Sequence, residues 1–245
     1  HDEERPGCRP LRTTPCYDRM KEKGAVFGHI YGWERPNWFA PEGVEPKDVW
    51  SFRRSNYFEH VGNECKNVAE NVGVLDMSAF AKFRVSGPGA ESWLDHLLAN
   101  RLPKKIGRVG LCHALNKEGG VRSEFTVTRD GPEEFYLVSA GALERFDWDY
   151  LMKQAPQDGS VRLEKITTQY GVLVVAGPRS RELLGRVTDC DLSNGAFPWL
   201  TSQFTDVNVA HCRLARVNFV GELGWEVHHP IEMQNHIFDA LFSAG

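Results

Sequence analysis

The sequence lacks several patterns that mark large classes of protein. Its six cysteines are scattered without a CxxC pair, and this density is far below that of a disulfide-stapled domain. We therefore expect reduced thiols, as in the cytoplasm or the mitochondrial matrix. No stretch approaches the ~20 apolar residues of a membrane-spanning helix, and the N-terminus has no signal-peptide pattern. A soluble protein without a membrane partner is expected.

Charge runs and metal-ligand patterns are also missing. The net charge is -4 and no long run of Lys and Arg occurs, which disfavours nucleic acid as a partner. The nine histidines show no metal-ligand spacing, because the adjacent His228 and His229 would point to opposite faces of a strand. No glycine-rich dinucleotide fingerprint opens the chain, so no residue here is assigned to a dinucleotide cofactor.

The chain begins at His1 without a Met and ends at Gly245 directly after a helical pattern, and we expect a fragment of a longer protein. Residues 1–48 carry many prolines, aromatics and charges. This composition predicts one short helix near Tyr17–Lys23 and otherwise an extended arm that packs its aromatic rings on a neighbour. We therefore divide the chain into a connector, 1–48, and a domain, 49–245.

In the domain, short strands alternate with amphipathic helices, which predicts an α+β fold. A strand over 81–85 leads through Gly87-Pro88-Gly89 to a helix over 90–98. A strand over 172–176 leads through Gly177-Pro178 to a second helical segment, which indicates two related strand-helix subdomains. Further helices are expected near 64–71, 142–153 and 231–242, and further strands near 72–77, 135–139, 161–167 and 207–219.

A β-hairpin is expected over 109–129, where Gly119-Gly120 marks the turn. A four-residue loop would place Asn116 opposite Val121, and counting outward places His113 opposite Glu124. Slipping the register by one residue would remove this pair. In the second strand, alternation places Glu124 and Arg122 on the polar face.

A second acidic turn lies between Gly221 and Gly224, where Glu222 is flanked by glycines and followed by a strand. The glycines let the backbone bend tightly and approach a ligand. A carboxylate in such a turn suits a flat, donor-rich heterocycle, although a solvated turn acid has the same pattern. Beyond the turn, Trp225 and Glu226 alternate in direction, so one of them is expected to face the core.

Five ordered motifs together resemble the folate-binding domain of the glycine-cleavage T-protein, or aminomethyltransferase, family over residues 49–245. They are VGVLDMS at 72–78, FRVSGP at 83–88, LNKEGGV at 115–121, VVAGP at 174–178 and FVGELGWE at 219–226. Segments of the arm, RPLRTTP at 9–15, GAVFG at 24–28 and GWERPNWF at 32–39, look like the connection between the flavin half and the folate half of dimethylglycine and sarcosine dehydrogenases.

The resemblance implies roles for individual residues. Glu124 occupies the position of an acid beside the reacting nitrogens of tetrahydrofolate and is the expected catalytic residue. Glu222 matches the acid that hydrogen-bonds the pterin amino and ring N–H groups. Phe219, where the family often has Tyr, offers a stacking surface. Tyr170 and His113 are further candidates for contact with the folate.

Alternatives remain for these assignments. Glu124 could be an exposed strand acid paired with Arg122 or Arg84, and Tyr170 could be a core residue. The aminomethyltransferases commonly carry a Tyr in the stretch filled here by Gly110–His113, and its absence favours the dehydrogenase-linked branch. Cys112 in this stretch is expected to be structural, because methylene transfer needs no thiol.

The resemblance implies a tetrahydrofolate-binding module that accepts the one-carbon unit released by oxidative demethylation of an N-methylglycine-type substrate, giving 5,10-methylenetetrahydrofolate. FAD would belong to an N-terminal half outside this sequence, and the C-terminal barrel of the family would also lie outside it. Two alternatives are a stand-alone folate-dependent aminomethyl- or methyltransferase and a non-catalytic regulatory subunit that retains the fold, as in the dehydrogenase-like regulatory subunit of a phosphatase.

Overall fold

A computed structural model describes residues 6–218 and 221–245 of the chain. Its helices are η1 (Pro6–Cys8), α1 (Tyr17–Glu22), α2 (Phe58–Glu70), α3 (Ala90–Leu97), η2 (Gly141–Leu143), α4 (Glu144–Gln154), α5 (Ser180–Leu184), η3 (Ile231–Met233) and α6 (Gln234–Ala244). Its strands are β1 (Ala25–Ile30), β2 (Trp33–Phe39), β3 (Gly73–Asp76), β4 (Ala81–Ser86), β5 (Leu98–Ala99), β6 (Val109–Leu115), β7 (Val121–Gly131), β8 (Glu134–Ser139), β9 (Arg162–Lys165), β10 (Tyr170–Ala176), β11 (Ser202–Val207), β12 (Ala210–Ala215) and β13 (Gly224–Pro230).

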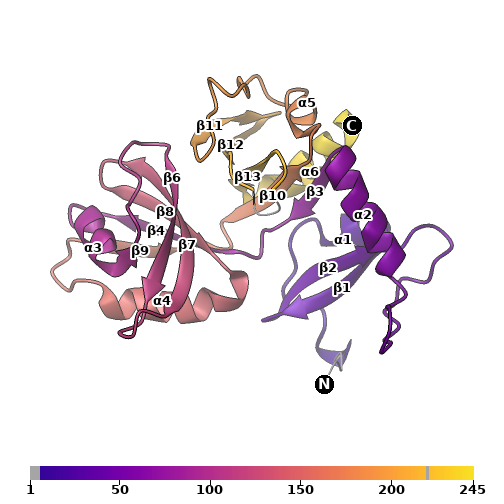
Figure 1. The fold of residues 1–245 in the computed structure, drawn as a ribbon, viewed down its shortest axis with the longest axis horizontal. Helices are drawn as coiled ribbons and strands as arrows, with labels where there is room; N and C mark the ends of the chain where they lie inside the picture. Colours follow the sequence, from indigo (N-terminus) through magenta and orange to yellow (C-terminus); the bar gives the residue numbers. More distant parts are fainter. Residues whose placement is uncertain (1–5, 219–220) are drawn as a thin grey trace.

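The strands form three open sheets with antiparallel pairing throughout (Figure 1). The six-stranded sheet has the order β5-β6-β7-β8-β4-β9, and the five-stranded sheet has the order β11-β12-β13-β10-β3. Apolar residues of α3 and α4 pack against the first sheet, and those of α1, α5 and α6 pack against the second. The predicted α+β fold is therefore confirmed.

The two larger sheets repeat one topology, as the sequence predicted. In each sheet the strand next to one edge, β4 or β10, continues through Gly-Pro into a helix, and its inner neighbour, β8 or β13, continues through a 3-10 turn into a longer helix. The outer strands are exchanged between the repeats. Strand β3 precedes β4 in the chain but pairs with β10, whereas β9 precedes β10 but pairs with β4. Neither repeat can complete its sheet without the other.

Equivalent hydrogen bonds confirm that the exchange is reciprocal. The amide of Lys82 on β4 donates to Thr167 Oγ1 at 3.1 Å, and the amide of Val172 on β10 donates to Ser78 Oγ at 2.9 Å. Thr167 follows β9 and Ser78 follows β3. Each exchanged strand is therefore fixed to its adopted sheet by a hydroxyl just beyond its end.

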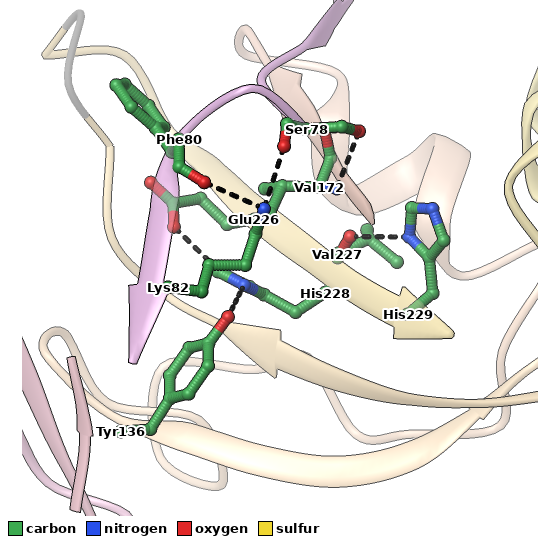
Figure 2. A network of polar contacts seen from close by, with 9 residues as sticks. All are labelled: Ser78, Phe80, Lys82, Tyr136, Val172, Glu226, Val227, His228 and His229. Atoms are coloured by element: carbon green, nitrogen blue, oxygen red, sulfur yellow. Dashed lines mark hydrogen bonds and ion pairs between the residues drawn. The ribbon is translucent and has the colours of Figure 1, made fainter. Parts of the chain in front are cut away.

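Lys82 contacts the segments that follow both exchanged strands, and Figure 2 shows its bonds to Ser78 and Phe80. Lys82 is 0% exposed. Its Nζ donates to the carbonyl oxygens of Ser78 at 2.8 Å, Phe80 at 3.0 Å and Thr167 at 3.4 Å. These three acceptors match the three hydrogens of an ammonium group. Because the carbonyls come from segments that follow β3 and β9, Lys82 ties the ends of both exchanged strands together.

The arm is more structured than its composition predicted. The helix near Tyr17–Lys23 is confirmed as α1, but the expectation of an extended chain elsewhere is wrong, because β1 and β2 form a hairpin. Its two-residue turn, Tyr31-Gly32, has positive φ angles of 51° and 84°, which suit the twist of paired strands. Trp38 is 1% exposed and packs in a cluster with residues of α2 and its approach.

Two boundaries in the domain also differ from expectation. Helix α2 begins at Phe58 rather than near Glu64. The strand expected over 207–219 is the shorter β12, which ends at Ala215. It pairs with β11, a strand that was not expected, through a turn that contains Asn208 at φ 53°. The turn was missed because the sequence offers Asn-Val there rather than a glycine-containing turn pair.

We expect Gly177→Ala to destabilise the protein by about 2 kcal/mol or more. Gly177 has φ 127°, and an added Cβ would lie 2.4 Å from the carbonyl oxygen of Asn71, next to the entry of β3. Gly43→Ala is the matched control, because Gly43 has φ 82° with nothing within 4 Å of the added Cβ. Urea unfolding measures both free energies, and equal losses would show that the close approach is unimportant.

We expect Lys82 to make stability depend on pH. Burial lowers its pKa to about 7, whereas an unfolded chain keeps this proton up to about pH 10.4. Between these values the unfolded state binds more protons, so the free energy of unfolding rises with pH, by at most about 1.4 kcal/mol per pH unit. Lys82→Met should lack this contribution. Urea unfolding of both proteins between about pH 6 and 9 measures it, and identical pH dependence would contradict it.

Candidate functional site

Glu124 and His113 face each other on the neighbouring strands β7 and β6. The Nε2 atom of His113 lies 3.0 Å from Oε2 of Glu124, and the two side chains are 31% and 54% exposed, respectively. The predicted contact is therefore confirmed. Both side chains are open to solvent, so the pair is accessible to a ligand.

The register that produces this pair differs from the predicted one. Leu115, not Asn116, lies opposite Val121, and a β-bulge between Ala114 and Leu115 restores the pairing further along the strands. The bulge also reorients Arg122, whose guanidinium lies over two aromatic rings of α4 at 4.2 and 4.5 Å. The expectation that Arg122 shares the face of Glu124 is wrong, because the bulge interrupts the alternation of side chains.

Neither arginine considered as a partner of Glu124 binds it. Arg122 is stacked on α4, and Arg84 pairs with Glu134 at 3.2 Å and Glu164 at 3.5 Å. The partner of Glu124 is therefore a histidine, which can donate or accept according to its protonation.

The other residues of β6 separate into two faces. Leu111, which alternates with His113 on the outer face, is 44% exposed and offers an apolar surface beside the pair. Cys112 is 0% exposed, and burial raises the pKa of its thiol to about 11. Cys112 is thus a protonated core residue at neutral pH, as expected for a structural cysteine.

Glu222 lies in the connection between β12 and β13 and is half-buried. Gly221 has φ 84°, and the side-chain amide of Asn218 donates to the backbone oxygen of Glu222. Within the described ranges no side chain binds the carboxylate of Glu222. The backbone of this connection is therefore held while its acid is left available.

The residues that precede the Glu222 turn pack against β6, the strand that carries His113. Val217 and Ala215 form a small apolar cluster with Val109, the first residue of β6. This contact brings the Glu222 connection and the His113–Glu124 hairpin together, although they come from different sheets. Phe219, the expected stacking residue, lies outside the described residues.

Tyr170 is the first residue of β10 and lies opposite Pro230 of β13. It is half-buried. On β13, Trp225 and Val227 are buried in the core beneath the helices, so Glu226 and His228 lie on the opposite face of the sheet. The expectation that one of Trp225 and Glu226 faces the core is confirmed for Trp225.

A chain of hydrogen bonds connects the two sheets (Figure 2). The hydroxyl of Tyr136 on β8 lies 2.9 Å from Nδ1 of His228 on β13, and Nε2 of His228 lies 2.9 Å from Oε2 of Glu226. Burial raises the pKa of Tyr136 and lowers that of His228. At neutral pH both groups are therefore uncharged, and Glu226 is the acidic end of the chain.

Arg213 on β12 makes a second connection between the sheets. It forms a bidentate ion pair with Asp130 of β7, and its guanidinium lies 4.4 Å from the ring centre of Tyr136 and 4.6 Å from that of Phe204. Both members of the ion pair are largely buried, with side chains 9% and 12% exposed. The contact fixes β12 against the β7–β8 end of the other sheet.

Tyr136, His228 and Arg213 also belong to this region, and the sequence patterns did not lead to their prediction as site residues. The adjacent residues His228 and His229 do point to opposite faces of β13, as the sequence predicts. His229 is 0% exposed, and its Nδ1 lies 2.9 Å from the oxygen of Val227. Alternation on β13 could have indicated that His228 lies beside Glu226. Nothing in the sequence indicated Tyr136 as their partner.

In the part of the chain that the structure describes, no three His, Cys, Asp or Glu residues gather so that they could hold a metal ion. None of its helices combines the length and the apolar character needed to cross a membrane.

Comparisons with known proteins identify the family to which the chain belongs. A family model described as the GCVT N-terminal domain matches residues 16–245. The chain is 38% identical over 245 residues to mitochondrial dimethylglycine dehydrogenase of Mus musculus, covering 99% of this chain and 28% of the relative. It is 29% identical over 283 residues to mitochondrial sarcosine dehydrogenase of Homo sapiens, covering 100% of this chain and 31% of the relative.

Among solved structures, the glycine cleavage system aminomethyltransferase T from Bartonella henselae matches with a TM-score of 0.75 and 23% identity, over 94% of this chain and 57% of that chain. This likeness shows the fold. The chain spans less than a third of the length of the two dehydrogenases. Because the family model covers nearly all of the chain, the chain belongs to the family of the GCVT N-terminal domain, and it is related to the dimethylglycine and sarcosine dehydrogenases.

Proposed function

We propose that this chain is a tetrahydrofolate-binding module that accepts the one-carbon unit released by oxidative demethylation of an N-methylglycine-type substrate, giving 5,10-methylenetetrahydrofolate. The observation that carries the proposal is the exposed His113–Glu124 pair. Glu124 follows the Gly119-Gly120 turn, at the position where the family resemblance implies an acid. Tetrahydrofolate would supply the two nitrogen atoms that take up the one-carbon unit.

The role of Glu124 follows from its surroundings. Its side chain is 54% exposed and has no cationic side chain of Lys or Arg bound to it in the described residues, so its negative charge is available to a ligand. A carboxylate in this position can accept a proton from a reacting nitrogen and stabilise positive charge that develops nearby. His113 holds one oxygen of the carboxylate and so restricts its orientation.

Glu222 is suited to recognition of the pterin. Its carboxylate is half-buried and has no partner in the described residues, whereas its backbone oxygen is held by Asn218. Two carboxylate oxygens can accept two adjacent N–H groups, which is the pattern of a donor-rich ring edge. Leu111 offers an apolar contact, and we propose that Tyr170 and Phe219 contribute ring surfaces.

We propose that the module works within a longer enzyme. Residues 1–48 would connect it to a flavin-dependent half, whose FAD would oxidise the N-methyl group. The arm is firmly attached to the module, because Cys16, Met20 and Ala25 belong to the core beneath the five-stranded sheet. The names of the related dehydrogenases support a mitochondrial location.

Two other functions are distinguishable. A stand-alone aminomethyl- or methyltransferase would lack a flavin-dependent half in the complete reading frame. A regulatory subunit that keeps the fold without catalysis would not need the site acids. Glu124 and Glu222 are both present, and this favours the proposed function over the regulatory one.

We expect Glu222→Ala to weaken tetrahydrofolate binding about 10- to 100-fold, because a carboxylate that accepts N–H hydrogen bonds contributes about 1.5–3 kcal/mol. Isothermal titration calorimetry under reducing conditions measures the affinity. Glu118→Ala is the matched control, because Glu118 is an exposed acid in the Gly119 turn of the other hairpin. Equal affinity of wild type and Glu222→Ala would remove Glu222 from the site, and no binding by folded wild type would refute the proposed function.

We expect Glu124→Gln to affect transfer more than binding. The affinity for tetrahydrofolate should change less than about threefold, while formation of 5,10-methylenetetrahydrofolate by the longer enzyme falls about 100-fold and free formaldehyde accumulates instead. Glu134→Gln neutralises another partly exposed strand acid, one that pairs with Arg84, and should leave both quantities unchanged. An unaltered transfer rate in Glu124→Gln would show that Glu124 is not catalytic.

A further inference from the structure

Glu226 is a half-buried acid with only one of its oxygens bound. Its side chain is 15% exposed, and Oε2 lies 2.9 Å from Nε2 of His228. In the described residues Oε1 has no hydrogen-bond partner, and it is not among the fully buried unsatisfied atoms. Oε1 of Glu226 is therefore available to accept a hydrogen bond from a ligand.

The orientation of Glu226 is set from the other sheet. Tyr136 is a protonated phenol, so its hydroxyl donates to Nδ1 of His228. This fixes the tautomer of the imidazole, whose Nε2–H must then donate to Oε2 of Glu226. A residue of the six-stranded sheet thereby determines where the carboxylate of the five-stranded sheet points (Figure 2).

In the described residues no Lys or Arg side chain forms an ion pair or a hydrogen bond with Glu226. Lys82 is close enough for its charge to interact with that of Glu226, but its Nζ donates to backbone carbonyl oxygens and not to the carboxylate. Arg213 lies on the neighbouring strand, but both of its terminal nitrogens bind Asp130. Burying a carboxylate without a cationic partner costs free energy of folding. The unbound oxygen of Glu226 therefore favours a role in binding a ligand.

We propose that Glu226 is a second ligand-binding carboxylate of the site, positioned by Tyr136 and His228, and that its Oε1 accepts a hydrogen bond from an N–H group of the bound folate. The proposal rests on the proposed function. Glu226 lies four residues beyond Glu222 on the same connection and strand, and it lies on the face of β13 that is directed to Tyr136. Glu222 and Glu226 would share the donor-rich ring between them.

The test is calorimetric titration of tetrahydrofolate into the wild-type chain and variants. Glu226→Gln keeps the shape and can still accept from His228, but it presents an amide N–H to the ligand, and we expect about tenfold weaker binding. His228→Leu should also weaken binding, and His228→Gln should restore most of that loss, because an amide nitrogen can replace Nε2–H. Glu164→Gln is the control, since Glu164 is a half-buried strand acid paired with Arg84 and Arg162.

The outcomes separate this inference from the proposed function. Binding by wild type with equal affinity in Glu226→Gln overturns the role of Glu226 and leaves the proposed function standing. No binding by wild type overturns both. Equal losses in His228→Leu and His228→Gln overturn the positioning role of His228.

A second measurement uses the wild-type chain and so does not depend on the folding of a variant. In a sample with ¹⁵N-labelled histidine, we expect tetrahydrofolate to shift the Nε2 resonance of His228. A ligand that donates a hydrogen bond to Glu226 Oε1 changes the charge on Oε2, which accepts from His228 Nε2. The exposed His211, which pairs with Asp206, should not shift. A bound ligand without a shift at His228 overturns the proposal.

Discussion

The reciprocal exchange of β3 and β9 is the constraint on which the rest of the structure depends. Each repeat supplies the outer strand of the other sheet, so the two sheets cannot form independently or turn freely against each other. Lys82 reinforces the exchange, because its amino group binds carbonyl oxygens that follow both exchanged strands. Burying an ammonium costs several kcal/mol unless its hydrogens are paired, and here all three are directed to acceptors.

The exchange places polar side chains of the two sheets within contact distance. Tyr136 hydrogen-bonds His228, and Arg213 pairs with Asp130, across the boundary between the sheets. Apolar side chains packed at such a boundary can stabilise a protein as much as buried ion pairs do. Buried polar pairs of this kind fix one relative arrangement, because any displacement leaves a donor or acceptor unsatisfied. A site assembled from both sheets needs such a fixed arrangement, since its acids are carried by different hairpins.

The acids of the candidate site differ in how they are held. Glu124 is exposed and bound by His113 of the adjacent strand, so local pairing within one hairpin suffices to place it. Glu222 depends on a glycine-containing connection that packs through Val217 on Val109 of the other sheet. Glu226 is oriented by a hydrogen-bond chain that begins on the other sheet. An acid held within one hairpin can be placed from the sequence pattern, whereas the position of an acid held by contacts with the other sheet cannot.

The sequence by itself determined the α+β class, the internal repeat and the contact between His113 and Glu124, because hydrophobic periodicity and the Gly119-Gly120 turn act over short distances along the chain. It did not determine the hairpins β1–β2 and β11–β12 or the bulge that turns Arg122 towards α4, because their turns and irregularities depend on packing. The strand exchange and the Tyr136–His228–Glu226 chain were decided only by the tertiary structure. Tyr136 and His228, for example, are 92 positions apart in the sequence. Such long-range pairings depend on the geometry of two complete sheets rather than on any local preference of the chain.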